Sequence, residues 1–148
     1  VGKSALNANT SGNLNVAIGK LALTANTTAE NNVAVGYNAA GSNTTGTRNA
    51  AIGYGAYDSS DTENDNLAIG HLAMTANTAG GTKNVAIGNY ALDSLTSGDN
   101  NVALGRNAGG QITTAGQNVY VGNSVLFACG FTYNSNTYMF QRTIPSCI

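Results

Sequence analysis

The 148-residue chain has little charge, a single proline, no tryptophan and no long apolar run. Only 9% of its residues are charged and the net charge is -1, so it lacks the basic surface that nucleic acids and anionic lipids require. No apolar run approaches the ~18 residues of a membrane span, and we expect no membrane insertion. Neutral polar residues must keep the chain in solution, and its 22 Asn and 19 Gly suit that role.

Cysteine is also scarce, because the chain holds only Cys129 and Cys147, both close to its C-terminal end. An even count in a chain of extracellular character favours a disulfide between the two. Two free thiols are the alternative.

What the chain has in abundance is one repeated motif, Asn-Val-Ala-Ile-Gly. Its first residues are Asn15, Asn32, Asn49, Asn66, Asn84, Asn101 and Asn118. Its last residues are Gly19, Gly36, Gly53, Gly70, Gly88, Gly105 and Gly122. The interval is constant except for one step, from Gly70 to Gly88, that is longer by a single residue. Self-similarity at a fixed short period predicts a stack of repeating units.

Each unit is too short for a pair of helices and contains two chain breakers. The Val-Ala-Ile segment alternates in the manner of a strand, so we expect an all-β, parallel β-solenoid of about 17 residues per coil, with coils about 4.8 Å apart. We expect the Val and Ile side chains to point into the coil, joined by the large residue four positions after each glycine, such as Leu23 or Leu92.

The Asn and Gly columns have structural interpretations. Stacked Asn amides can hydrogen-bond along the column, and asparagine tolerates the backbone of a corner. The glycines at the next corner are expected to adopt a positive φ or to permit close approach of neighbouring coils.

The alanine between Val and Ile is then expected to face outward. This column comprises Ala17, Ala34, Ala51, Ala68, Ala86 and Ala103. A dry strip of small residues predicts packing against another copy of the chain, so we expect a homo-oligomer with these alanines at the chain–chain interface. A monomeric coil with a second buried layer is the alternative.

The motif Asn-Val-Ala-Ile-Gly, followed by Ala and Leu, resembles the head repeats of trimeric autotransporter adhesins. The longer unit, which continues to Asn-Thr-x-Gly, is similar to repeats in phage and viral tail fibres and in large bacterial surface proteins. The resemblance covers residues 1–126, although the adhesin repeats are usually shorter. It implies a left-handed β-roll, a homotrimer and a fibre or adhesin segment, and it implies no catalytic residue.

The repeat weakens after Leu126, and residues 127–148 are expected to form a separate C-terminal cap or tip, closed by the Cys129–Cys147 disulfide if that bond forms. Residues 136–140 resemble a distorted final coil with Phe140 in the glycine position. A receptor- or glycan-binding tip and an end-to-end polymerisation joint are alternatives for the same segment.

No motif predicts catalysis, a metal site or a cofactor. His71 is the only histidine, and Asp58, Asp61, Glu63 and Asp65 lack the glycine and distal Glu of a calcium loop. Three formal glycosylation sequons begin at Asn9, Asn26 and Asn43, and repeat geometry accounts for them without a glycan.

These observations favour a non-enzymatic, extracellular rod on a virion or cell surface. A phage or viral tail-fibre segment for host attachment is the leading hypothesis, followed by a bacterial surface adhesin head and a self-assembling filament subunit. A module that binds a cell-surface glycan through Tyr37, Tyr54 and Tyr90 is the remaining alternative.

Overall fold

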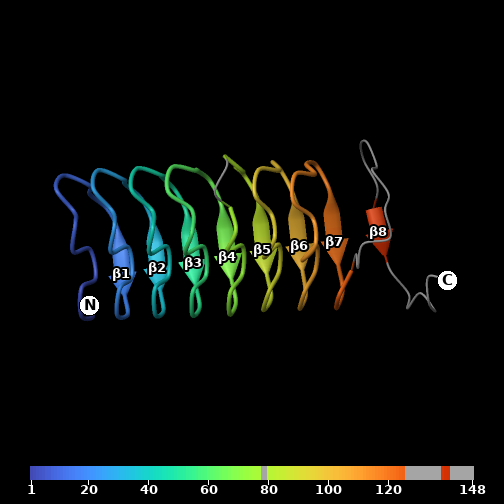
Figure 1. The fold of residues 1–148 in the computed structure, drawn as a ribbon, viewed down its shortest axis with the longest axis horizontal. Helices are drawn as coiled ribbons and strands as arrows, with labels where there is room; N and C mark the ends of the chain where they lie inside the picture. The colour runs from blue at the N-terminus through green and yellow to red at the C-terminus, as the bar shows by residue number, and fades with distance from the viewer. Residues whose placement is uncertain (78–79, 126–137, 141–148) are drawn as a thin grey trace.

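The computed structural model describes residues 1–77, 80–125 and 138–140. In this part of the chain the strands are β1 (Val16–Ile18), β2 (Val33–Val35), β3 (Ala50–Ile52), β4 (Leu67–Ile69), β5 (Val85–Ile87), β6 (Val102–Leu104), β7 (Val119–Val121) and β8 (Tyr138–Phe140). Each strand pairs in parallel with the next, and the sheet order is β1 through β8 (Figure 1). The predicted all-β, parallel β-solenoid is confirmed, and so is its predicted period.

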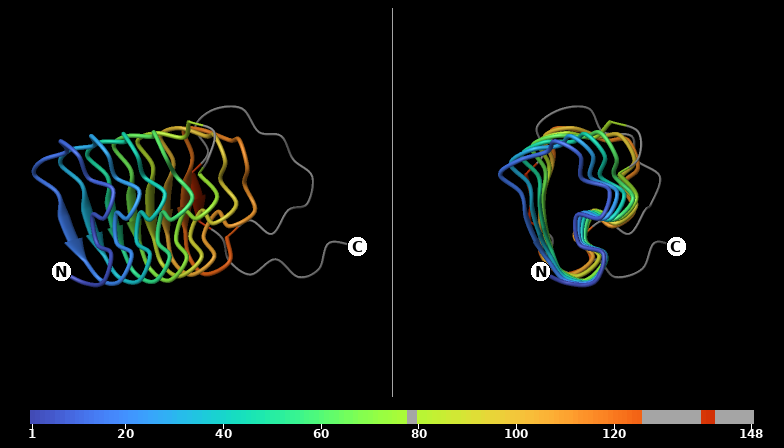
Figure 2. Two further views of the ribbon diagram at one scale, coloured as in Figure 1. Left: turned by 60° about the vertical axis from the view of Figure 1, so that its left-hand side comes forward. Right: turned by 90° about the vertical axis from the view of Figure 1, so that its left-hand side faces the viewer.

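The coils from β1 to β7 superimpose when the molecule is seen along the stack (Figure 2). Equivalent residues of neighbouring strands face one another, as Ala34 does Ala51, so each coil repeats the previous one in register. Strand β8 continues the sheet with Phe140 opposite Val121. Phe140 therefore occupies the isoleucine position and not the expected glycine position. The described residues contain no helix with the length and apolarity of a membrane span.

Three residues in each coil bend the chain with a left-handed backbone. They lie just before the Asn, two positions after the corner glycine and four positions after it, as in Arg48, Leu72 and Leu92, with φ of 58°, 51° and 50°. Their N–H groups donate to carbonyls of neighbouring coils; Leu72 donates to Tyr54 at 2.9 Å and Leu92 to Ala108 at 3.0 Å. These intercoil bonds hold backbone conformations that L-residues otherwise avoid.

The coil interior is filled mainly by alanine. The strand alanines from Ala34 to Ala103 are fully buried, and Ala17 is 7% exposed. A second alanine column, three positions after each glycine, and the large residues Leu23, Tyr57, Met74 and Leu92 complete the core. The large residue after the glycine is thus buried, as expected.

The expected orientation of the strand residues is wrong, because alanine points inward and valine and isoleucine point outward. The three left-handed bends fold each coil tightly and bring the second alanine column and the large residue against the sheet. The space left at the strand centre admits a methyl group. The alanines Ala17 to Ala103 are consequently not available to a second chain, and their expected role at a chain–chain interface is corrected.

One coil shows how tightly this interior volume is shared. In β7 the strand centre is Tyr120, which is 4% exposed, and the large-residue position of the preceding coil is Gly109. A Cβ atom on Gly109 would lie 2.9 Å from Cδ2 of Tyr120 and 2.8 Å from Cδ2 of Leu92. The tyrosine ring therefore fills the volume that a leucine fills in the coils of Leu23 and Leu92.

The single lengthened step is accommodated by a buried carboxylate. Glu63 is 3% exposed at a position that holds Gly or Ala in other coils. One of its oxygens accepts the backbone N–H of Gly80, in the lengthened coil, at 3.0 Å. The other accepts the N–H groups of Asp61 and Thr62 at 3.0 and 3.2 Å. Backbone donors thus solvate both oxygens of this carboxylate.

Candidate functional site: the outer strand face and its two rims

The Asn column joins neighbouring coils through their backbones. In Asn32, Oδ1 accepts the N–H of Asn49 at 2.8 Å, and Nδ2 donates to the carbonyl of Gly46 at 2.8 Å. The same two bonds recur at Asn49, Asn66, Asn84 and Asn101. Direct amide–amide bonds occur farther along, from Asn101 to Asn84 at 3.1 Å and from Asn118 to Asn101 at 3.2 Å. Each of these Asn side chains therefore links its own coil to the backbone of the next coil.

The corner glycines combine a positive φ with close approach of the next coil. Gly70 has a φ of 139°, and a Cβ atom there would lie 2.5 Å from the carbonyl oxygen of Gly88. The corner glycines from Gly19 to Gly122 all have φ between 129° and 139°. Both the Asn and the Gly columns thus serve the geometry of the stack.

The surface that the inverted strands create is an aliphatic strip, here called the outer face. It consists of the first and third residues of β1 to β7, which are Val, Ile or Leu except for Ala50. Among the more exposed members, Ile18 is 48%, Ile52 38% and Ile87 37% exposed. Six strand spacings of about 4.8 Å make this strip roughly 30 Å long. Exposed apolar surfaces of this extent are typical of interaction sites.

A row of aromatic, basic and asparagine residues borders the outer face at the ends of the strands. This post-corner rim comprises Lys20, Tyr37, Tyr54, His71, Asn89, Arg106 and Asn123, each directly after a corner glycine. Tyr37 and Tyr54 stack with ring centroids 5.1 Å apart, and His71 stacks on Tyr54 at 5.3 Å. Lys20 lies 5.6 Å from the centroid of Tyr37, and Tyr90 meets His71 edge-on at 5.2 Å.

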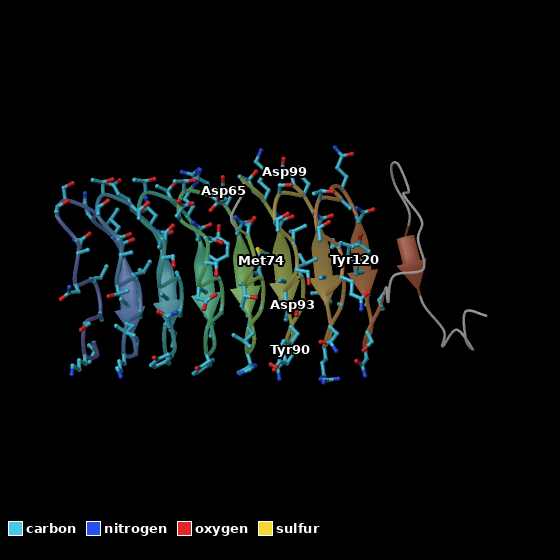
Figure 3. All side chains as sticks on the ribbon, in the orientation of Figure 1. Asp65, Met74, Tyr90, Asp93, Asp99 and Tyr120 are labelled. Atoms are coloured by element: carbon cyan, nitrogen blue, oxygen red, sulfur yellow. The ribbon has the colours of Figure 1, made fainter. Side chains whose placement is uncertain are left out.

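A second row of residues borders the outer face at the N-terminal ends of the strands. This pre-strand rim comprises Leu14, Asn31, Arg48, Asp65, Lys83, Asn100 and Gln117, all with φ between 57° and 63°. Arg48 donates through Nε and Nη2 to the Asp65 carboxylate at 2.5 and 3.0 Å. That guanidinium lowers the pKa of Asp65, and Lys83 adds to the effect. Asp65 and Tyr90 lie at opposite ends of the strands in Figure 3.

The four acids between residues 58 and 65 do not converge. Glu63 turns inward onto backbone N–H groups, and Asp65 joins Arg48. Asp58 lies near Asn38, and partial burial raises the pKa of its carboxyl. Partial burial likewise raises the pKa of Asp93, which lies farther along the stack. Among the residues that the structure describes, no group of three or more His, Cys, Asp or Glu could hold a metal ion.

Two of the three sequon asparagines are buried. Asn26 and Asn43 are fully buried, and their amides donate to the carbonyls of Ala29 and Gly46. Asn26 also donates to Oδ1 of Asn9 at 2.7 Å. A glycan on either buried amide is incompatible with this fold, so the Asn-Thr pair has a structural role at these positions.

Other predicted sites lie outside the described residues. Cys129, Cys147 and the disulfide expected between them belong to this group, as do most of the C-terminal cap or tip expected at 127–148 and the aromatic residues expected to be exposed on it. The described part of that segment is strand β8.

Sequence reasoning missed the outer face and therefore the meaning of its rims. The signal was present in Tyr120 and Gly109, since in the repeated segments at β1 to β7 the one strand centre that is not alanine coincides with the loss of the large residue after the glycine. That exchange of volume indicates that the two positions share an interior. No family model, curated protein or solved structure matches the chain.

Proposed function

We propose that the chain is a segment of a non-enzymatic structural fibre, a phage or viral tail fibre used in host attachment. The proposal rests on a repetitive, in-register stack with an exposed aliphatic face about 30 Å long. The resemblance of the repeat adds the left-handed coil, the homotrimer and the extracellular setting on a virion or cell surface. The chain's self-association takes place through the outer face, in place of the buried alanines.

A bacterial surface adhesin head is the second candidate, because the same stack and outer face suit it equally. A subunit of a self-assembling filament remains a further alternative. The exposed tyrosines Tyr37 and Tyr54 support a glycan-binding role for the post-corner rim. Their rings stack on one another, however, so they present edges and hydroxyls to a ligand more than open ring faces.

The self-association is tested by mass in solution. We expect light scattering to give about three times the 14.9 kDa of one chain. The double variant Ile52→Glu/Ile87→Glu places charge on the outer face and is expected to give monomers with an unchanged far-ultraviolet circular dichroism spectrum. Thr28→Glu/Thr114→Glu adds the same charge on exposed turns and should leave the mass unchanged. A monomeric parent protein would contradict the fibre proposal.

The attachment role is tested with the labelled parent protein on cells. Saturable binding to bacterial cells is expected of a phage fibre, whereas binding to animal cells or matrix and not to bacteria would favour the adhesin alternative.

A further inference from the structure

The outer face has two unlike edges, and this difference determines how copies can meet. One edge is the pre-strand rim, with Arg48, Asp65 and Lys83 at its centre. The other is the post-corner rim, with Tyr54, His71 and Asn89 at the same heights. Each strand carries one member of each rim, six positions apart in the sequence, at its two ends.

A rotation axis parallel to the rod fixes which rims touch. In any such cyclic assembly with the outer faces turned inward, the strand beginnings of one chain adjoin the strand ends of the next. The pure rotation keeps each coil at its own height. Residue pairs six positions apart in the sequence are therefore brought together between chains, and this result holds for a dimer or a trimer.

The matched pairs are chemically compatible. Asp65 meets His71, and Arg48 meets Tyr54, whose exposed hydroxyl can accept a hydrogen bond from the guanidinium. The Asp65 carboxylate has acceptor sites left after its two bonds with Arg48. Lys83 meets Asn89, and Arg106 meets Asn100. None of the interchain pairs, from Leu14–Lys20 to Gln117–Asn123, brings together two charges of the same sign.

The reverse arrangement is unfavourable when the two rods are centred on β4. If two outer faces packed with their rods antiparallel and centred on β4, each pre-strand rim would lie against its own copy. Asp65 would then face Asp65 and Arg48 would face Lys83, which are repulsive pairs.

We infer that the occupant of the outer face is a second copy of this chain, parallel and at the same height, with the pre-strand rim of one copy docked on the post-corner rim of the next. This inference rests on the proposed self-association and adds its polarity, its register and its interchain pairs. Asp65–His71 and Arg48–Tyr54 are the contacts that set the register.

Cysteine pairs test the register directly. Lys83 and Asn89 are exposed, and within one chain they are separated by six residue steps along an extended segment that rises roughly 3.3 Å per residue. A disulfide needs Cα atoms roughly 4.4–6.8 Å apart, so Lys83→Cys/Asn89→Cys can form this bond only between chains. The matched control is Lys83→Cys/Asn123→Cys, since exposed Asn123 lies two coils farther along the same rim.

After mild oxidation, we expect non-reducing electrophoresis to show covalent oligomers for Lys83→Cys/Asn89→Cys, ending at the mass of the closed ring. The control pair should remain at the level of the single variants Lys83→Cys and Asn89→Cys, which also report any linkage to the native cysteines. Light scattering on the same samples separates the two proposals. An oligomer without preferential linkage would overturn the rim pairing alone, and a monomer would overturn the self-association as well.

Discussion

Asparagine and glycine perform different tasks at the two ends of each strand. Asn32, for example, binds a backbone N–H and a backbone carbonyl of the next coil, and so occupies polar groups that would otherwise be buried without partners. Gly70 contributes the absence of a side chain, because its φ and the nearby Gly88 carbonyl leave no room for one. The first task requires an amide side chain, and the second requires a residue that has no Cβ atom.

Replacing Gly70 by valine is therefore expected to be severe. The variant combines a strained φ with a clash against backbone, and we expect it to lose more than about 3 kcal/mol of unfolding free energy, measured by chemical denaturation. Gly80→Ala is the control, since Gly80 also has a positive φ of 100° but open space around a Cβ atom. It should cost only about 1–2 kcal/mol. Equal losses for the two variants would mean that strain alone, and not close approach, explains the corner glycine.

At the scale of the element, each strand is only three residues long and depends on the coil around it. Its two outward side chains leave the strand centre as the only contact with the interior. The opposite wall is built from residues with left-handed backbone, such as Leu92, which intercoil hydrogen bonds hold in place. Strand and wall therefore share one volume, and a larger residue on one side requires a smaller one on the other.

Substitutions at Gly109 and Tyr120 test whether the strand and the opposite wall share one volume. We expect Gly109→Leu alone to destabilise the protein by about 1–3 kcal/mol, because the leucine would overlap the Tyr120 ring. Tyr120→Ala alone should also destabilise it, by about 3–5 kcal/mol, because it leaves a cavity. The double variant restores the leucine–alanine combination found at Leu23 with Ala34 and at Leu92 with Ala103, and it is expected to recover most of the loss in a double-mutant cycle of thermal unfolding. Additive losses would show that the two side chains do not share a volume.

At the scale of the whole molecule, stability comes from stacking identical layers, since no single coil buries enough surface to fold alone. Ion pairs contribute little in the described residues, where the Arg48–Asp65 pair lies at the surface. Buried tyrosines, in contrast, connect the fold to pH. Burial raises the pKa of Tyr120 to about 12, and burial also raises the pKa of Tyr57.

These shifts predict alkaline unfolding. A tyrosine in the unfolded chain ionises near pH 10, so the contribution of Tyr120 to stability is complete below about pH 10 and is lost as the pH rises through about 12. Tyr120→Phe should leave the melting temperature at pH 7 nearly unchanged and raise it above pH 10. Exposed Tyr54→Phe removes the same number of phenols and is the control. An equal alkaline gain in both variants would contradict a specific role for Tyr120.

The sequence by itself determined the repeating coil, its period, the parallel pairing of the strands and the positions of the Asn and Gly columns. These follow from the constant spacing of the repeated motif and from the alternation of side-chain direction within Val-Ala-Ile, which are local properties of the chain. Alternation also placed alanine and the β-branched residues on opposite sides, but it could not determine which side is the interior. Only the tertiary structure decided this, because three left-handed turns, in residues as varied as Arg48, Leu72 and Leu92, set how narrow the coil is. A narrow interior accepts alanine and leaves valine and isoleucine outside, where they create the outer face.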